Sequence, residues 1–154
     1  MLYFSPKFYF LALIYGIFSA IASFLFQSFL VTLFPSTAFI PFFLLFSFVF
    51  IEEGMKFLFL KKLLSSQQSI WNTVILGLFF ALGFSLLEIS LIFSSPEKNI
   101  FSIAVFFPSF IHIITSIFWS LGIQKSSTLY ILIFGLLAIF IHGLYNSILL
   151  LFFS

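Results

Sequence analysis

The sequence contains no cysteine, aspartate or arginine, and only 6% of its 154 residues are charged. Without cysteine there is no disulfide, no thiolate nucleophile and no cysteine-ligated metal centre. Six lysines and four glutamates are too few to cover the surface of a water-soluble domain. Scattered lysines with a net charge of +2 also argue against nucleic-acid binding. Any chemistry must therefore use Glu, His, Lys, Ser, Thr, Tyr and Asn.

Apolar residues make up 63% of the chain and aromatic residues 23%, and the mean hydropathy is +1.32. These values predict an integral membrane protein. Because lipid cannot satisfy free backbone groups, each long apolar run is expected to be a helix. We expect a single all-α membrane domain over residues 1–154, with transmembrane helices at about 8–34, 41–64, 70–93, 100–123 and 128–153. Pro108 is expected to bend the fourth helix one turn before His112.

The lysines indicate the orientation of this bundle. Once the predicted turns alternate between the two sides, one side holds Lys7, Lys61, Lys62 and Lys125. Only Lys98, beside Glu97, falls on the other side. The side rich in lysine is expected to be cytoplasmic, which places the amino terminus inside and the carboxyl terminus outside. Abundant Phe and Lys without Arg indicate an AT-rich genome, so we expect a multi-pass protein of a bacterial inner membrane.

Six ionisable residues fall inside the predicted helices and away from the helix ends: Glu52, Glu53, Lys56, Glu88, His112 and His142. Each costs at least ~2.5 to 3.5 kcal/mol at the centre of a bilayer, which makes it a candidate functional residue. At 1.5 Å per residue, Glu52 lies roughly 14 Å from Lys61 and His142 lies roughly 21 Å from Thr128. Glu88 lies higher, roughly 25 Å from the inner boundary, but its side chain and helix tilt can bring it down, so that all these groups can converge on one site.

The spacing of these residues also predicts which helix faces they occupy. Glu52 and Lys56 are four residues apart on one face, while Glu53 is rotated by about 100°. This favours Glu52 as the partner of Lys56 and leaves the other carboxylate available. On the last helix, His142 and Asn146 lie one turn apart. On the third predicted helix a stripe of small residues ends near Glu88, and its members are Gly77, Ala81 and Ser85. Small residues allow another helix to approach closely, so Glu88 is expected to face protein rather than lipid.

Four segments that contain these residues follow one another in a characteristic order. They are EEGMK at 52–56, GFSLLE at 83–88, HIITSIFWSLG from His112 onward and HGLYN at 142–146. In this order they resemble the PrsW family of membrane-embedded glutamic-type proteases, which is close to the CAAX-prenyl endopeptidases and bacteriocin-processing proteins. The resemblance covers about Glu52 to the carboxyl terminus. Ile89 departs from it, because the family often has Asn after the second-motif Glu.

The resemblance implies hydrolysis of a peptide bond in a membrane protein or peptide substrate. Glu52 or Glu53, beside Lys56, would accept a proton from water as general base. The resemblance gives a supporting part in water activation to Glu88 or His112. His142 and Asn146 would donate hydrogen bonds to the oxyanion of the tetrahedral intermediate. We expect no cofactor in this glutamic form.

Two alternatives remain. A metal-dependent hydrolase would hold a divalent ion with Glu53, Glu88, His112 and His142, although the HExxH signature of many zinc proteases is absent. A protein without enzymatic activity, either a proton-coupled carrier or a partner subunit, would use the same groups as a relay. The sequence is also compatible with an oligomer or with a partner chain that supplies further helices.

Overall fold

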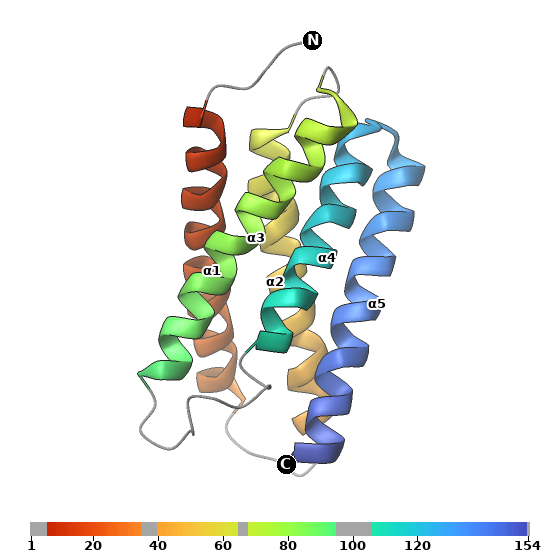
Figure 1. The fold of residues 1–154 in the computed structure, drawn as a ribbon. Helices are drawn as coiled ribbons and strands as arrows, with labels where there is room; N and C mark the ends of the chain where they lie inside the picture. Colours follow the sequence, from red (N-terminus) through yellow and green to blue (C-terminus); the bar gives the residue numbers. More distant parts are fainter. Residues whose placement is uncertain (1–5, 35–39, 65–67, 95–105, 154) are drawn as a thin grey trace.

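The computed structural model describes residues 6–34, 40–64, 68–94 and 106–153. These residues form five helices and no strand (Figure 1): α1 (Pro6–Leu33), α2 (Ile40–Leu63), α3 (Ile70–Phe93), α4 (Phe106–Gln124) and α5 (Thr128–Phe153). The predicted all-helical class with five helices is confirmed. The largest difference in bounds concerns α4, because its predicted start near residue 100 lies outside the described residues.

Successive helices run in alternating directions through the bundle (Figure 1). The end at which α1 begins also holds the end of α2 and the α4–α5 turn, and therefore carries Lys7, Lys61, Lys62 and Lys125. The segment with Glu97 and Lys98 lies outside the described residues. The cytoplasmic location of the lysine-rich end stays a prediction.

Four helices are long and apolar enough to cross a membrane: Pro6–Leu33, Ile70–Leu91, Phe107–Gln124 and Thr128–Leu151. Several of their apolar side chains are more than 60% exposed and form the surface that lipid would cover: Phe10, Phe29, Leu136, Phe140 and Leu151. The protein is therefore a multi-pass membrane protein. The remaining helix, α2, is apolar at its start but carries Glu52, Glu53 and Lys56 near its middle. It packs against α1, α4 and α5, which cover its charged middle.

Small residues bring the helices close together. A Cβ atom on Gly16 of α1 would collide with the backbone of Phe80, and one on Gly83 of α3 would collide with the backbone of Leu13. The two helices therefore cross at these glycines, as small residues allow in membrane bundles. The predicted small-residue stripe of α3 is buried, as expected: Gly77, Ala81 and Ser85.

Pro108 lies in the first turn of α4. The N–H groups of a first turn have no acceptor within the helix, so a proline there removes no helical hydrogen bond. The described helix thus contains no proline in its interior that would bend it before His112, and His112 follows Pro108 on a regular helix.

Candidate active site

Four helices bring six ionisable side chains into one network of contacts, which we call the ionisable cluster. Its members are Glu52, Glu53 and Lys56 of α2, Glu88 of α3, His112 of α4 and His142 of α5. The expectation from their depths, that these residues converge, agrees with this arrangement.

Glu53 lies at the centre of the cluster and is completely buried. Its Oε1 accepts hydrogen bonds from Lys56 Nζ and His142 Nδ1, each at 2.6 Å. Its Oε2 accepts one from Trp119 Nε1 at 2.8 Å. Both carboxylate oxygens are therefore occupied by protein donors, which compensate for the burial of the charge. The predicted pairing of Lys56 with Glu52 is wrong, because Lys56 pairs with Glu53 three residues away and Glu52 is the available carboxylate.

Lys56 is also completely buried, and its Nζ has three partners. They are Glu53 Oε1, Thr115 Oγ1 at 2.9 Å and His112 Nδ1 at 2.8 Å. An ammonium group has three donors and no acceptor, so it matches these three partners only when each of them accepts. His112 Nδ1 must then be unprotonated, and Nε2 carries the proton that it donates to Glu88 Oε2 at 2.7 Å. This chain of contacts fixes the orientation of the His112 ring.

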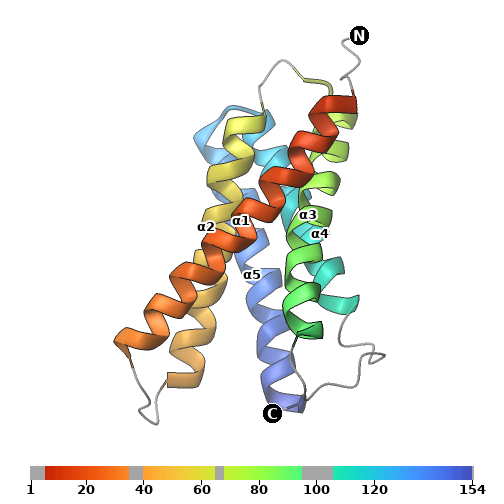
Figure 2. The ribbon, with the colours of Figure 1, turned by 90° about the vertical axis from the view of Figure 1, so that its left-hand side faces the viewer.

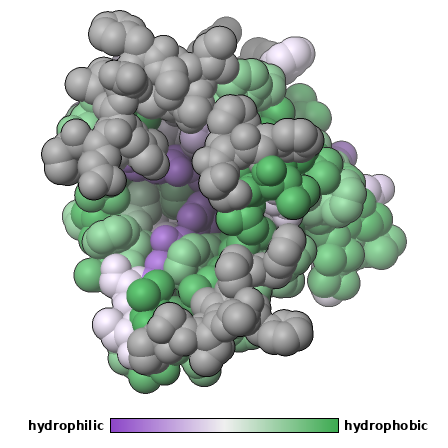
Figure 3. All heavy atoms as spheres, turned by 90° about the horizontal axis from the view of Figure 1, so that it is seen from below, coloured by the Kyte–Doolittle hydropathy of each residue, from purple (hydrophilic) through white to green (hydrophobic). Residues whose placement is uncertain are grey.

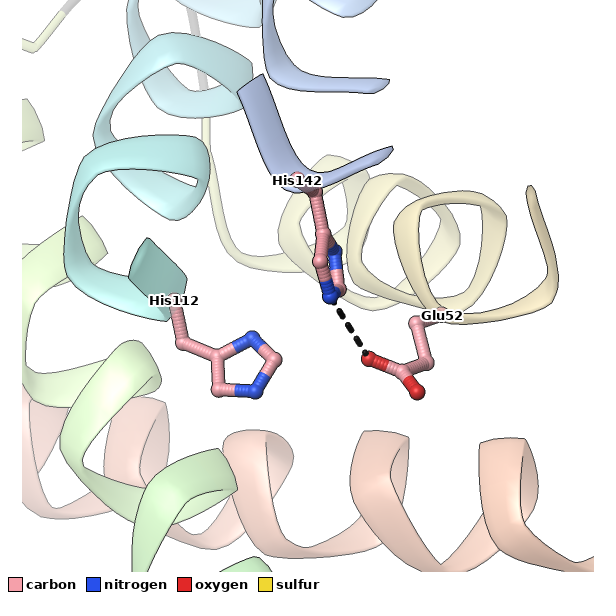
Figure 4. A group of neighbouring side chains, drawn as sticks. All are labelled: Glu52, His112 and His142. Atoms are coloured by element: carbon pink, nitrogen blue, oxygen red, sulfur yellow. Dashed lines mark ion pairs between the residues drawn. The ribbon is translucent and has the colours of Figure 1, made fainter. Parts of the chain in front are cut away.

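His142 and Glu52 face each other across the α2–α5 contact (Figure 4). His142 donates its Nδ1 proton to Glu53, so in the neutral imidazole Nε2 keeps a lone pair. That nitrogen lies 3.5 Å from Glu52 Oε2, whose carboxylate also accepts a hydrogen bond from Gln27 Nε2 at 2.7 Å. Two acceptors thus point at one another, an arrangement that a proton or a cation between them would satisfy.

The cluster borders a pocket of about 80 Å³, which we call the active-site pocket. Its polar lining consists of Glu52, Glu88, His112, His142, Tyr145 and Asn146. From the end at which α1, α3 and α5 finish, the surface is hollowed, and hydrophilic residues lie inside the hollow between hydrophobic ones (Figure 3). The bundle therefore holds polar groups in a cavity that is large enough for water.

The donor set fits a divalent metal ion once His112 gives up its Nε2 proton, as an imidazole does when it binds a metal. One ligand atom each from Glu52, His112 and His142 lies within 4.8 Å of the others. Two imidazoles and one carboxylate form a common set of protein ligands for catalytic zinc, with one position left open. A carboxylate that holds the other nitrogen of a ligand His is the usual outer partner, and Glu53 has this relation to His142. When both imidazoles are neutral, three carboxylates face one ammonium group, so two negative charges are unbalanced. A divalent ion supplies the two positive charges that would balance them.

Four polar residues at the site were not predicted from the sequence: Gln27, Thr115, Trp119 and Tyr145. Gln27 has the one amide side chain in the apolar α1 segment, and a lone amide in an apolar helix is a signal that could have identified it as a site residue. Thr115 and Trp119 follow His112 at helical spacing on the same face, which was a weaker signal. Tyr145 lies within the HGLYN segment, next to Asn146, and this position was a signal that could have identified it.

The fold and the site together define a class of protein: a multi-pass helical membrane protein with carboxylates and imidazoles around a water-sized pocket, as in hydrolases that activate water. The family model described as "PrsW family intramembrane metalloprotease" matches residues 5–154. The chain therefore belongs to the PrsW family of intramembrane proteases, and the predicted resemblance is confirmed and extended to α1. No curated protein and no solved structure matches the chain.

Membership in this family has two consequences for the alternatives above. A protease acts on a protein substrate in the membrane, so the carrier and the partner subunit lose their support. The family's description names metalloproteases, which differs from the glutamic type expected from the sequence and supports the metal-dependent form.

Proposed function

We propose that the protein hydrolyses a peptide bond within an apolar segment of a membrane protein, and that Glu52, His112 and His142 hold a divalent metal ion for this reaction. The contact between His142 Nε2 and Glu52 Oε2 carries the proposal, because two acceptors face each other at 3.5 Å in a cluster with excess negative charge. Of the four ligands that we expected, His112 and His142 stay in the set. Glu52 replaces Glu53, since both oxygens of Glu53 are already occupied, and Glu88 is no longer counted as a ligand.

When bound, a divalent ion lowers the pKa of water to about 7 and polarises the carbonyl group of the scissile bond. The buried pair of Glu53 and Lys56 positions the side chains that would hold it. Glu53 accepts the Nδ1 proton of His142 and so directs Nε2 toward Glu52. Lys56 holds His112 through Nδ1. These two residues are positioning residues, because neither lines the active-site pocket.

Glu88 is the carboxylate best placed to transfer protons. It lines the active-site pocket, its side chain is 34% exposed, and it is not a member of the Glu52, His112 and His142 group. We assign to Glu88 the role of general base toward water and then of general acid toward the leaving amine. In the structure Glu88 accepts the Nε2 proton of His112, and when His112 gives up this proton to bind a divalent ion, the Glu88 carboxylate is left free beside the ion.

The oxyanion of the tetrahedral intermediate requires hydrogen-bond donors at the active-site pocket. Asn146 lines the active-site pocket, and we keep it as a donor. We no longer assign His142 to the expected pair of oxyanion donors, because it donates its Nδ1 proton to Glu53. Tyr145 takes its place: its hydroxyl is buried beside the same pocket and has no hydrogen-bond partner among the described residues. A phenol held without a partner can donate to an oxygen that becomes charged.

A metal-free protease with Glu52 as general base is the second candidate. The same 3.5 Å contact favours it when His142 carries a second proton and donates to Glu52. Apolar peptides of about 20 residues, the length of a membrane span, in detergent micelles provide a substrate for both forms. We expect 1,10-phenanthroline to abolish their cleavage and added zinc to restore it. Cleavage that persists in the chelator, by protein without bound metal, would favour the second candidate.

A further inference from the structure

A second cavity, of about 110 Å³, lies between α1 and α3, and we call it the α1–α3 pocket. Glu52 and Glu88 line both this pocket and the active-site pocket, so the two cavities adjoin the same carboxylates. Its apolar wall consists of Ala20, Phe24, Phe84, Leu87 and Leu91. The α1–α3 pocket therefore adjoins the site of reaction but is mostly apolar itself.

The crossing of α1 and α3 explains why this pocket exists. The helices touch at Gly16 and Gly83, and beyond these residues they diverge toward their ends at Leu33 and Phe93 (Figure 2). Ala20 of α1 follows the crossing by one turn and leaves space where a larger side chain would fill it. The pocket thus occupies the angle between two helices that face lipid on their outer sides.

Apart from the two carboxylates that it shares with the active-site pocket, the polar groups of the α1–α3 pocket are engaged within the protein. The hydroxyl of Ser23 donates to the Ser19 carbonyl oxygen, and Gln27 Nε2 donates to Glu52. At its rim, Phe24 and Leu91 are 48% and 42% exposed, so the rim itself is apolar. A volume of about 110 Å³ is smaller than the cavity of about 150 Å³ that holds benzene in another protein. This space suits an aliphatic group of the size of leucine.

We propose that the α1–α3 pocket is a substrate subsite, which receives an aliphatic side chain next to the scissile bond from a peptide that arrives laterally between α1 and α3. This proposal rests on the proposed function. In an extended peptide, successive side chains point in opposite directions. A peptide bound at Glu52 and Glu88 therefore places one side chain in the α1–α3 pocket and its neighbour toward Tyr145 and Asn146.

The first test is a change in side-chain preference. A library of apolar peptides of about 20 residues in detergent micelles, varied at each position, is incubated with the enzyme, and new termini are identified by mass spectrometry. We expect the wild type to favour leucine at one position beside the cleaved bond. Ala20→Leu fills the pocket, and we expect it to shift the preference from leucine toward alanine by at least about tenfold. Leu87→Ala enlarges the pocket and should shift the preference toward phenylalanine.

Ile21→Leu is the matched control, because residue 21 lies next to Ala20 on α1 but is 37% exposed and does not line the pocket. It introduces the same side chain and is expected to leave the preference unchanged. If Ala20→Leu and Leu87→Ala reduce cleavage of all peptides equally, the pocket is not a subsite.

A binding measurement separates this proposal from the proposed function. Library peptides that carry photo-leucine are cross-linked to the enzyme, and the attached residues are mapped. We expect attachment within 20–27 and 84–91, with a severalfold loss in Ala20→Leu. Attachment there without any cleavage would refute the protease mechanism and retain the pocket. Cleavage with attachment elsewhere would refute the pocket and retain the mechanism.

Discussion

Two adjacent glutamates are expected to have opposite roles, and exchanging each for glutamine tests this directly. Glu53 is fully buried with three donors around it, whereas Glu52 faces the active-site pocket. Glu53→Gln removes the only carboxylate that pairs with Lys56 in the structure as described. Breaking a buried ion pair by removing one partner destabilises a protein by about 3–5 kcal/mol. Glu52→Gln removes a charge from a cluster with excess negative charge, so its free energy of unfolding should change by less than about 1 kcal/mol.

The assay is thermal unfolding in detergent micelles, with a chelator present so that a bound metal does not contribute to stability. By the scaling for chains of 150–250 residues, the loss in Glu53→Gln corresponds to a midpoint lower by on the order of 10 °C. Glu52→Gln should unfold close to the wild type and yet be inactive. The double variant Glu53→Gln/Lys56→Met removes both charges, and we expect it to recover much of the stability but not the activity, because His142 still lacks its carboxylate partner. Equal destabilisation by Glu52→Gln and Glu53→Gln would refute the assignment of roles.

Three further variants test other contacts. Tyr145→Phe is expected to lower kcat by about 10²–10³-fold, as loss of an oxyanion donor does, and to leave the metal content unchanged. Steady-state kinetics measure this effect, with Tyr130→Phe on the exposed face of α5 as the control. Gln27→Leu removes the hydrogen bond to Glu52 and should lower kcat, while the free energy of unfolding falls by only about 0.5–1.5 kcal/mol. An unchanged kcat would show that this hydrogen bond has no part in catalysis. Gly83→Ala should separate α1 from α3 and lower the unfolding midpoint, whereas Gly54→Ala has open space around it and should be neutral or stabilising in the same melt.

The fold could be predicted from the sequence because each helix is a long apolar run ended by prolines or polar residues. The convergence of the site could be predicted as well. Ionisable residues are costly to expose to lipid, so those on four neighbouring helices face the bundle interior, where they can pair with one another. The match with a known family followed from the order of EEGMK, GFSLLE, the His112 segment and HGLYN.

The roles of the two adjacent glutamates could not be predicted. On a helix, residues three and four positions away are both neighbours, so Lys56 can reach Glu52 or Glu53. The choice depends on donors from other helices, His142 Nδ1 and Trp119 Nε1, which meet Glu53 only in the folded bundle. The contact of Gln27 with Glu52 has the same origin, because it depends on how α1 packs against α2.

The central claim is that Glu52, His112 and His142 hold a divalent metal ion, and metal content measures it most directly. Purified wild-type protein, His142→Ala and Ser147→Ala are analysed by mass spectrometry for zinc and other divalent ions. Ser147 is the control on α5, since its hydroxyl only donates to the Gly143 carbonyl oxygen. We predict about one ion per chain in the wild type and in Ser147→Ala, and its loss in His142→Ala. Active wild-type protein without a bound divalent ion would contradict the account.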